Sequence, residues 1–301
     1  MKTDTAPNFF ILGAAKAGTT ALAAYLGQHP QVYISPIKEP HFFTLENESP
    51  AFLDPGDAAR AVTAWPEYLD LFNGCRAEVA IGEASTTYLH SQKAAAGIHH
   101  RFPEARLIAV LRQPVERAYS AFVMYQRENR EDKGTLLEAI ACENQGKHYR
   151  GEIGVYLERG FYTAALRRYL DLFGRNRLRV YLYEDFKENP QAVLDDLHRH
   201  IGVEAFQPDM SLSHNVGGLH RSGLLKGLLT RPNPVRYVAR GLLPGSFRAR
   251  VRERIKRFDL RKAPGIDAET WTVLLDRYRS DILQLQDLIE RDLGHWLRPH
   301  P

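Results

Sequence analysis

The sequence of 301 residues contains little cysteine and no long apolar run. Its two cysteines, Cys75 and Cys142, lack the spacing of metal ligands and are too few for a disulfide framework, so we expect reduced packing residues. No apolar run approaches the roughly 20 residues that a helix needs to span a bilayer. The N-terminus is polar, and the apolar stretch after it is too brief for a signal peptide, which favours a cytoplasmic protein.

The chain also lacks a strong excess of charge of either sign. Lysine and arginine number 40 against 36 acidic residues, which gives a formal net charge of +4. This mild excess is compatible with anionic ligands but too small to indicate binding to nucleic acid. We see neither internal repeats nor low-complexity segments. The length fits one large α/β domain or two small ones, and we expect a single domain over residues 1–301, with a core over about 8–220 and a basic, helical part over 221–301.

One stretch near the N-terminus has the pattern of a phosphate-binding loop. Four apolar residues, 9–12, run into a loop of small residues, 13–20, that contains Lys16. Helix-forming residues follow at 21–26, so we expect a buried strand, a tight loop and a helix N-terminus. Such a loop directs backbone N–H groups and the positive end of the helix dipole at one point. The pattern therefore predicts a site for a phosphate or sulfate ester.

The spacing of this loop differs from that of nucleotide triphosphatases. Their motif places lysine directly after the second glycine, with a hydroxyl for magnesium after it. Here Lys16 lies three residues after Gly13 and two before Gly18, and Thr19 and Thr20 follow. The pattern G-x-x-K-x-G-T-T resembles the 5′-phosphosulfate loop of sulfotransferases that use 3′-phosphoadenosine 5′-phosphosulfate (PAPS). For this loop taken alone, an ordinary strand–turn–helix junction stays an alternative.

A second stretch, residues 35–43, combines a carboxylate, an imidazole, two prolines and two aromatic residues. Glu39 and His41 stand two residues apart, and the prolines stiffen the backbone around them. A carboxylate beside aromatic walls can have a raised pKa, which suits a general base. The segment Lys-Glu-Pro-His-Phe-Phe resembles the part of glycosaminoglycan and bacterial sulfotransferases that carries the acidic catalytic base. The resemblance implies Glu39 as that base, with His41 positioning the acceptor or tuning Glu39.

A further acidic residue, Glu83, follows a short strand predicted at 79–82, in the pattern Gly-Glu-x-Ser-x-x-Tyr. This segment also resembles the sulfotransferase family. Because Glu83 stands at a strand end, we expect it to face the cleft, as the reserve candidate for the base and a substrate contact. Heparan-type members commonly carry lysine after this glutamate, whereas this chain has Ala84, which weakens any transfer of the heparan substrate.

The strand predicted at 106–111 ends in Arg112 and runs into the pattern R-x-P-x-x-R-x-x-S. Pro114 fits the first turn of a helix, and open α/β sheets bind ligands at the carboxyl ends of strands. The guanidinium fork of Arg112 suits a phosphate, and Ser120, two helical turns on, adds a hydroxyl donor. The pattern resembles the family's 3′-phosphate site, which implies that role for both residues. Arg117 fits either this site or a structural ion pair.

Residues 221–262 are dense in arginine and lysine. We interpret them as a solvated basic face, with a patch for an acidic acceptor or an anionic membrane surface as the alternative. The polar segment 213–222 resembles the family's late loop that closes over adenosine 3′,5′-bisphosphate (PAP), and this implies a contact for Arg221. Apolar spacing from 268 to about 293 predicts a long amphipathic helix.

Together the motifs predict an α/β fold. We expect a P-loop-like, three-layer arrangement with a central, mainly parallel sheet flanked by helices. The resemblance covers residues 8–200 and implies a sulfotransferase that moves the sulfuryl group of PAPS to an acceptor by in-line displacement, releases PAP and needs no metal. It implies that the 5′-phosphate is held by Lys16 and by the backbone N–H groups of Ala17, Gly18, Thr19 and Thr20.

The residues leave the acceptor open among small molecules, carbohydrates and lipids, and between hydroxyl and amine. We expect loops at 44–64 and 121–160 to form its pocket. We expect neither a nucleic acid partner nor a membrane span, and peripheral membrane contact stays an alternative. A P-loop kinase or other nucleotide phosphotransferase is the rival enzyme, although the Gly-Lys-Ser/Thr of that class is missing. A non-catalytic module for anionic ligands is the third interpretation.

Overall fold

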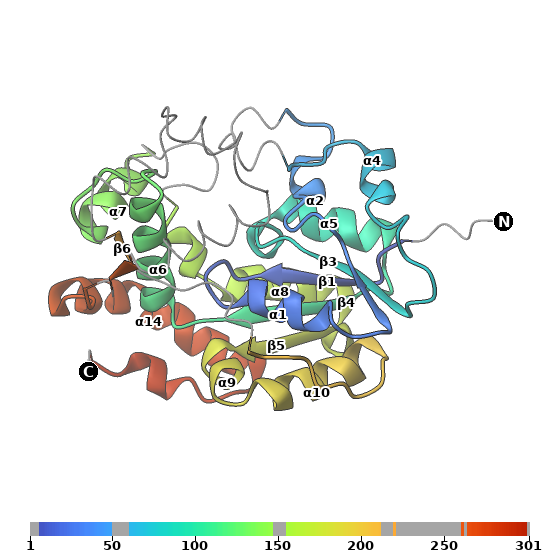
Figure 1. Cartoon of the computed structure of the whole chain (residues 1–301). Helices are drawn as coiled ribbons and strands as arrows, with labels where there is room; N and C mark the ends of the chain where they lie inside the picture. Colours follow the sequence, from blue (N-terminus) through green and yellow to red (C-terminus); the bar gives the residue numbers. More distant parts are fainter. Residues whose placement is uncertain are drawn as a thin grey trace, which may run out of the picture.

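The computed structural model describes residues 6–49, 60–146, 155–211, 219–220, 260–261 and 264–299. Its centre is a five-stranded sheet in the order β2-β3-β1-β4-β5, in which every neighbouring pair is parallel. The strands are β1 (Phe9–Gly13), β2 (Val32–Ile34), β3 (Ala80–Ala84), β4 (Arg106–Leu111) and β5 (Leu178–Leu182). Helices cover both faces, with α1 in front of the sheet and α8 behind it in Figure 1. The predicted α/β fold is confirmed.

Helices connect the parallel strands, as crossover connections of this kind require. The α-helices are α1 (Thr19–Leu26), α2 (Phe42–Leu45), α4 (Trp65–Asp70), α5 (Gln92–Arg101), α6 (Pro114–Arg127), α7 (Leu136–Asn144), α8 (Thr163–Phe173), α9 (Tyr183–Glu188), α10 (Pro190–Ile201) and α14 (Ala268–Ile289). Short 3-10 turns are η2 (Tyr88–His90), η3 (Glu158–Gly160), η4 (Arg175–Arg177) and η5 (Gly294–Leu297). Two short strands, β6 (Leu219–His220) and β7 (Leu260–Arg261), pair antiparallel. Over the described residues, none of the helices combines the length and the apolar character that a membrane crossing requires.

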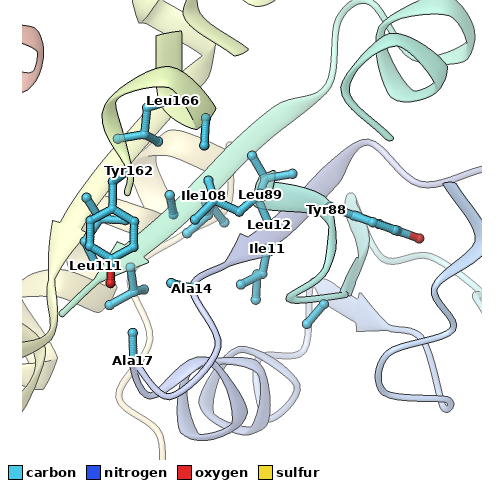
Figure 2. Packing of buried hydrophobic residues seen from close by; sticks show 14 of the residues in the cluster. Ile11, Leu12, Ala14, Ala17, Tyr88, Leu89, Ile108, Leu111, Tyr162 and Leu166 are labelled. Carbon is cyan, nitrogen blue, oxygen red and sulfur yellow. The ribbon is translucent and has the colours of Figure 1, made fainter. Parts of the chain in front are cut away.

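Strand β1 lies in the middle of the sheet and is buried along its whole length. A strand covered on both faces is apolar throughout, which explains the run Phe-Phe-Ile-Leu. Figure 2 shows its side chains packed with apolar residues from neighbouring elements, among them Leu89, Ile108, Leu111, Tyr162 and Leu166. Ala14 and Ala17, from the loop after β1, lie in the same cluster. The loop is therefore seated on the core.

The region 121–160 is more helical than the sequence predicts. Residues 121–127 continue α6, and α7 follows at 136–144. A capping box begins α7, because the Thr135 hydroxyl accepts from the Glu138 N–H while the Glu138 carboxylate accepts from the Thr135 N–H. The prediction of a loop over this whole region was therefore wrong, since the Thr-x-x-Glu signature was overlooked.

The segment after α14, residues 291–297, packs on α9. Arg291 forms an ion pair with Asp185. The indole N–H of Trp296 donates to Glu184, whose carboxylate also lies 2.8 Å from the His295 ring. Trp296 is 2% exposed. The two acidic residues at the start of α9 thus anchor the end of the chain to the body.

This segment also reaches the end of β4. The Gln113 amide donates to the Trp296 carbonyl oxygen at 3.2 Å. The Gln113 side-chain oxygen accepts from the Glu116 N–H at 2.9 Å and so caps the start of α6. Because Gln113 directly follows Arg112, the C-terminal segment supports the junction at which Arg112 lies.

Candidate active site

The strand, loop and helix predicted at the N-terminus are present as β1, residues 14–18 and α1. Three residues of this stretch have positive φ values, Gly13 with 144°, Lys16 with 71° and Gly18 with 86°. No side chain of the described residues caps α1, and its first turn contains no acidic residue. The first N–H groups of a helix have no partner within the helix. This end of α1 therefore has the geometry and polarity of an anion site.

The loop packs against Tyr183, which directly follows β5. A Cβ atom on Gly18 would lie 3.2 Å from the Tyr183 ring, so the loop approaches the ring as closely as glycine allows. The Arg112 guanidinium lies 4.8 Å from the centroid of the same ring. Its Nη1 donates to the Lys16 carbonyl oxygen at 3.4 Å. The structure thus brings Arg112 to the loop that carries Lys16.

Arg112 lies between β4 and α6, where the sequence places it. Its guanidinium donates to the Glu116 carboxylate from Nε at 3.1 Å and from Nη2 at 2.8 Å. Ser120 lies farther along α6 and is partly exposed. Arg117 is 1% exposed and donates to the Tyr156 carbonyl oxygen. Arg117 is therefore part of the scaffold, although its partner is a carbonyl and not the carboxylate of an ion pair.

Lys16 extends toward α6. Its Nζ lies 3.1 Å from the Met124 sulfur. Burial and the charges of Arg127 and Arg112 lower the pKa of Lys16 to about 8, although two nearby carboxylates oppose the shift. The sequence analysis missed Met124 and Arg127. They stand four and seven residues after Ser120, so the helical period would have placed them on the same face of α6.

Glu39 lies on a second loop, between β2 and α2. One of its carboxylate oxygens pairs with the Lys38 ammonium. The other oxygen accepts from the Thr86 hydroxyl at 3.3 Å and lies 3.8 Å from Nε2 of His41. The His41 Nδ1 is 3.1 Å from the Thr87 hydroxyl. Glu39 and His41 have φ of 60° and 58°, and strain of this kind persists where surrounding contacts impose it, often at functional sites.

The pKa of Glu39 shifts in the direction opposite to the predicted one. Burial raises this pKa, as the sequence predicts, but the Lys38 ammonium together with His41 and Thr86 outweighs burial and lowers it. The prediction of a raised pKa was therefore wrong. The Lys38 side chain points toward Glu39, and this orientation decides the sign of the pKa shift of Glu39. The Glu39 carboxylate is ionised at neutral pH and able to accept a proton.

Glu83 points into the core and not into the cleft where the sequence analysis placed it. Strand β3 extends through residue 84, and the Glu83 side chain is 0% exposed. Its oxygens accept from the hydroxyls of Tyr68 at 2.9 Å, Tyr88 at 2.7 Å and Ser85 at 2.7 Å. Burial raises the pKa of Glu83 to about 7, against the lowering effect of these hydroxyls. With no exposed surface, the Glu83 carboxylate is out of reach of an acceptor in this conformation.

The predicted site residues that the structure brings together are Lys16, Glu39 and Arg112. The charges of Glu39 and Arg112 both act on the Lys16 ammonium. Lys16 follows β1, Glu39 follows β2 and Arg112 follows β4. Because these strands are parallel, their carboxyl ends lie at one edge of the sheet. Arg221 and most of the basic region around it lie outside the described residues. In the described part, no cluster of His, Cys, Asp and Glu could hold a metal ion.

Comparison with known proteins gives matches over most of the chain. Residues 7–208 match the model of the Sulfotransferase family. The bifunctional heparan sulfate N-deacetylase/N-sulfotransferase 4 of Mus musculus is 24% identical over 306 residues, which cover 98% of this chain and 31% of that protein. Carbohydrate sulfotransferase 15 of Homo sapiens is 30% identical over 247 residues, which cover 65% of this chain and 44% of that protein.

A solved structure matches nearly the whole chain. The crystal structure of a sulfotransferase from Alicyclobacillus acidocaldarius superposes with a TM-score of 0.72 at 30% sequence identity. The match covers 97% of this chain and 99% of the bacterial one. In contrast, this chain spans only about a third of the length of the heparan sulfate relative, 31%.

Proposed function

The chain belongs to the sulfotransferase family, and from this premise we propose that it transfers a sulfuryl group from PAPS to a hydroxyl or amine. The observation that carries the proposal is the meeting of Lys16, Arg112 and Glu39 at the carboxyl edge of the sheet. Two cations suit a donor that carries phosphates at two positions. One ionised carboxylate suits the removal of a proton from the acceptor.

The residues around the first loop fit the donor. Lys16 and the N–H groups of residues 17–20 would hold the 5′-phosphate and stabilise the charge that grows on the leaving oxygen. The Ala17 N–H donates to the Ala14 carbonyl oxygen at 3.2 Å and would share its proton with the phosphate. Arg112 and Ser120 would hold the 3′-phosphate. The Arg112 fork now contacts Glu116, whose side chain is 43% exposed, so the phosphate would replace or share that carboxylate. PAPS itself supplies the sulfuryl group and a phosphate leaving group.

Glu39 would act as the general base. Its pKa lies below the ordinary value, so the carboxylate is free of a proton at neutral pH. It would take the acceptor's proton as the acceptor oxygen or nitrogen forms a bond to sulfur, while the bond from sulfur to the leaving oxygen breaks. His41, held by Thr87 and 3.8 Å from Glu39, would orient the base. Lys16 and the N–H groups supply positive field at the leaving group.

Calorimetric titration with PAP tests the donor assignment. We expect PAP to bind without magnesium, ADP to bind weakly, and Arg112→Ala to lose roughly tenfold or more in affinity, because a charge-assisted contact is removed. Arg106→Ala is the matched control, since Arg106 is an exposed arginine at the other end of the same strand. Tighter binding of ADP with magnesium would instead support the nucleotide phosphotransferase.

We propose a carbohydrate as the acceptor, because the named relatives are carbohydrate and heparan sulfate sulfotransferases. The test is release of PAP from PAPS in the presence of heparan sulfate with free amines and a panel of hydroxyl-bearing saccharides. Glu39→Gln should lower turnover at least 100-fold and leave PAP affinity within about twofold, because it removes the proton acceptor only. Near-normal turnover in this variant would remove Glu39 as the base, and absence of acceptor-dependent PAP release would favour a binding module.

A further inference from the structure

The buried carboxylate of Glu83 lies beneath the loop that carries Glu39. None of its surface is exposed, and it is surrounded by hydroxyl groups from three residues. Ser85 donates to one oxygen at 2.7 Å, and Tyr88 and Tyr68 donate to the other at 2.7 Å and 2.9 Å. A carboxylate with both oxygens engaged in this way is an organising centre for its neighbours.

Two of these hydroxyls continue to the backbone of the loop that carries Glu39. The Ser85 hydroxyl accepts from the His41 N–H at 3.2 Å, and the Tyr88 hydroxyl accepts from the Phe43 N–H at 3.3 Å. A hydroxyl has one proton to donate and lone pairs to accept with, so each can connect the carboxylate to one N–H group. Figure 2 shows the Tyr88 hydroxyl directed away from the apolar cluster.

The third hydroxyl has no such continuation. Tyr68 donates to the same Glu83 oxygen as Tyr88, and its ring stacks on Phe42 at 4.5 Å between centroids. No contact of the Tyr68 hydroxyl with the backbone of 39–43 occurs among the described residues. Both tyrosines therefore donate to Glu83, but of the two only the Tyr88 hydroxyl accepts from the Phe43 N–H.

The supported stretch has an unusual backbone. Glu39 and His41 both have left-handed φ values, which residues with side chains adopt only when other contacts hold them. The Glu39 N–H donates at 3.0 Å to the carbonyl oxygen of Ala84, the residue that follows Glu83. The N–H groups of residues 39, 41 and 43 thus attach this loop to residues 83–88. Two of these attachments are made by hydroxyls that donate to Glu83.

We propose that Glu83 is a positioning residue that, through the hydroxyls of Ser85 and Tyr88, fixes the backbone that aims the Glu39 carboxylate at the acceptor. The proposal rests on the proposed role of Glu39 as the base. It gives Glu83 a part in the reaction without contact with either substrate. The charge of Glu39 raises the pKa of Glu83, so the two carboxylates are also within electrostatic reach.

Hydrogen exchange of the backbone amides, measured residue by residue, tests the attachment without any ligand. Ser85→Ala should accelerate exchange at His41, and Tyr88→Phe should accelerate exchange at Phe43, each by roughly five- to tenfold, because one hydrogen bond is lost. Tyr68→Phe is the matched control. It removes a hydroxyl from the same carboxylate and should change neither amide more than about twofold.

Turnover separates positioning from a merely structural role. With the saccharide acceptor that supports PAP release, Ser85→Ala and Tyr88→Phe should lower kcat roughly tenfold with KM and PAP affinity unchanged, and Ser85→Thr should restore kcat. Glu83→Gln should reproduce both exchange effects in one variant. Equal effects of Tyr68→Phe and Tyr88→Phe, or unchanged exchange at both amides, would overturn the proposal. If the wild type binds no PAP, the proposed function fails, while the exchange pattern still decides whether Glu83 holds the loop.

Discussion

Glu39 and Glu83 are acidic residues of adjacent segments at one edge of the sheet, and their surroundings shift their pKa values in opposite directions. The Lys38 ammonium holds the pKa of Glu39 below its ordinary value, despite burial. Burial raises the pKa of Glu83 to about 7, although three hydroxyls donate to it. Of the two, Glu39 has a partly exposed carboxylate, as the proposed role of base requires.

The affinity for PAP should fall as pH rises through about 8. Burial, with the charge of Arg127, lowers the pKa of Lys16 to about 8, so the ammonium loses its proton above this value and attracts phosphate less. The phosphates of the ligand are fully ionised above about pH 7, since their second pKa is near 6. Calorimetry from pH 7 to pH 10 should show a loss approaching tenfold per unit. Lys16→Arg should flatten this dependence, and an equal decline in that variant would contradict the role of Lys16.

At the scale of elements, the loop between β1 and α1 depends on contact with the start of α9. Gly18 has φ 86°, and a Cβ there would lie 3.2 Å from the Tyr183 ring, so the ring would have to move by a few tenths of an ångström. The same ring supports the Arg112 guanidinium from 4.8 Å. One aromatic side chain thus connects the part of the site that suits a 5′-phosphate to the part that suits a 3′-phosphate.

Gly18→Ala should disturb both parts at once. A left-handed backbone alone costs about 1 kcal/mol in a residue with a Cβ, and displacement of Tyr183 adds roughly 1–3 kcal/mol. Gly202→Ala is the matched control, because Gly202 has a left-handed backbone with φ 79° and ψ 33° and no atom within 4 Å of its missing Cβ. Urea unfolding should show the larger loss of free energy for Gly18→Ala. Only this variant should weaken PAP binding, and equal losses of stability in the two variants would count against the contact.

Much of the fold follows from patterns within single elements. The apolar runs at 9–12 and 106–111 predict β1 and β4, because a strand buried on both faces must be apolar. The positions of Lys16 and Arg112 at the carboxyl edge of the sheet are predictable, because both residues come after these strands in the sequence. What the patterns do not contain is contact between elements. The approach of Tyr183 to Gly18 depends on β5 lying next to β4, which no local period encodes.

The same limit explains the errors at the second loop. The sign of the pKa shift of Glu39 depends on where the Lys38 side chain points, and two adjacent residues in a sequence do not specify that. The burial of Glu83 depends on how far β3 extends and on where α4 and η2 place Tyr68 and Tyr88 against the sheet. Strand ends predicted from sequence are uncertain by a few residues. An error of this size moves a side chain from the cleft to the core.

At the scale of the whole molecule, residues 291–297 near the end of the chain support the site through their contacts with α9 and Gln113. Trp296 is buried against α9 and accepts a hydrogen bond from Gln113, which directly follows Arg112. Its neighbour His295 contacts the same carboxylate, Glu184, with a side chain that is 40% exposed. Burial, and not the shared ionic partner, should decide how much each residue contributes to stability.

Trp296→Ala should therefore lower the free energy of unfolding by about 3–5 kcal/mol, the range for buried aromatic residues. His295→Ala removes a partly exposed contact to the same carboxylate and should cost less than about 1 kcal/mol. Guanidinium unfolding of the two variants checks the difference. PAP affinity should fall in Trp296→Ala only, because loss of the indole releases the segment whose backbone carbonyl at residue 296 holds the Gln113 amide. Similar stabilities of the two variants would show that residues 291–297 do not support the body.

The order of the strands has a consequence for how such a protein can be recombined. Strands β2 and β3 lie on one side of β1, and β4 and β5 lie on the other. The residues that contact Glu39 directly, Lys38, His41, Ala84 and Thr86, all come from residues 30–104, whereas Arg112 and Tyr183 come from the chain after it. A single exchange of this stretch between relatives, with one junction near Pro30 and one near Pro103, would carry the proton-accepting half across intact. On the proposed function, such an exchange would change the acceptor while the half that holds the nucleotide is inherited unchanged.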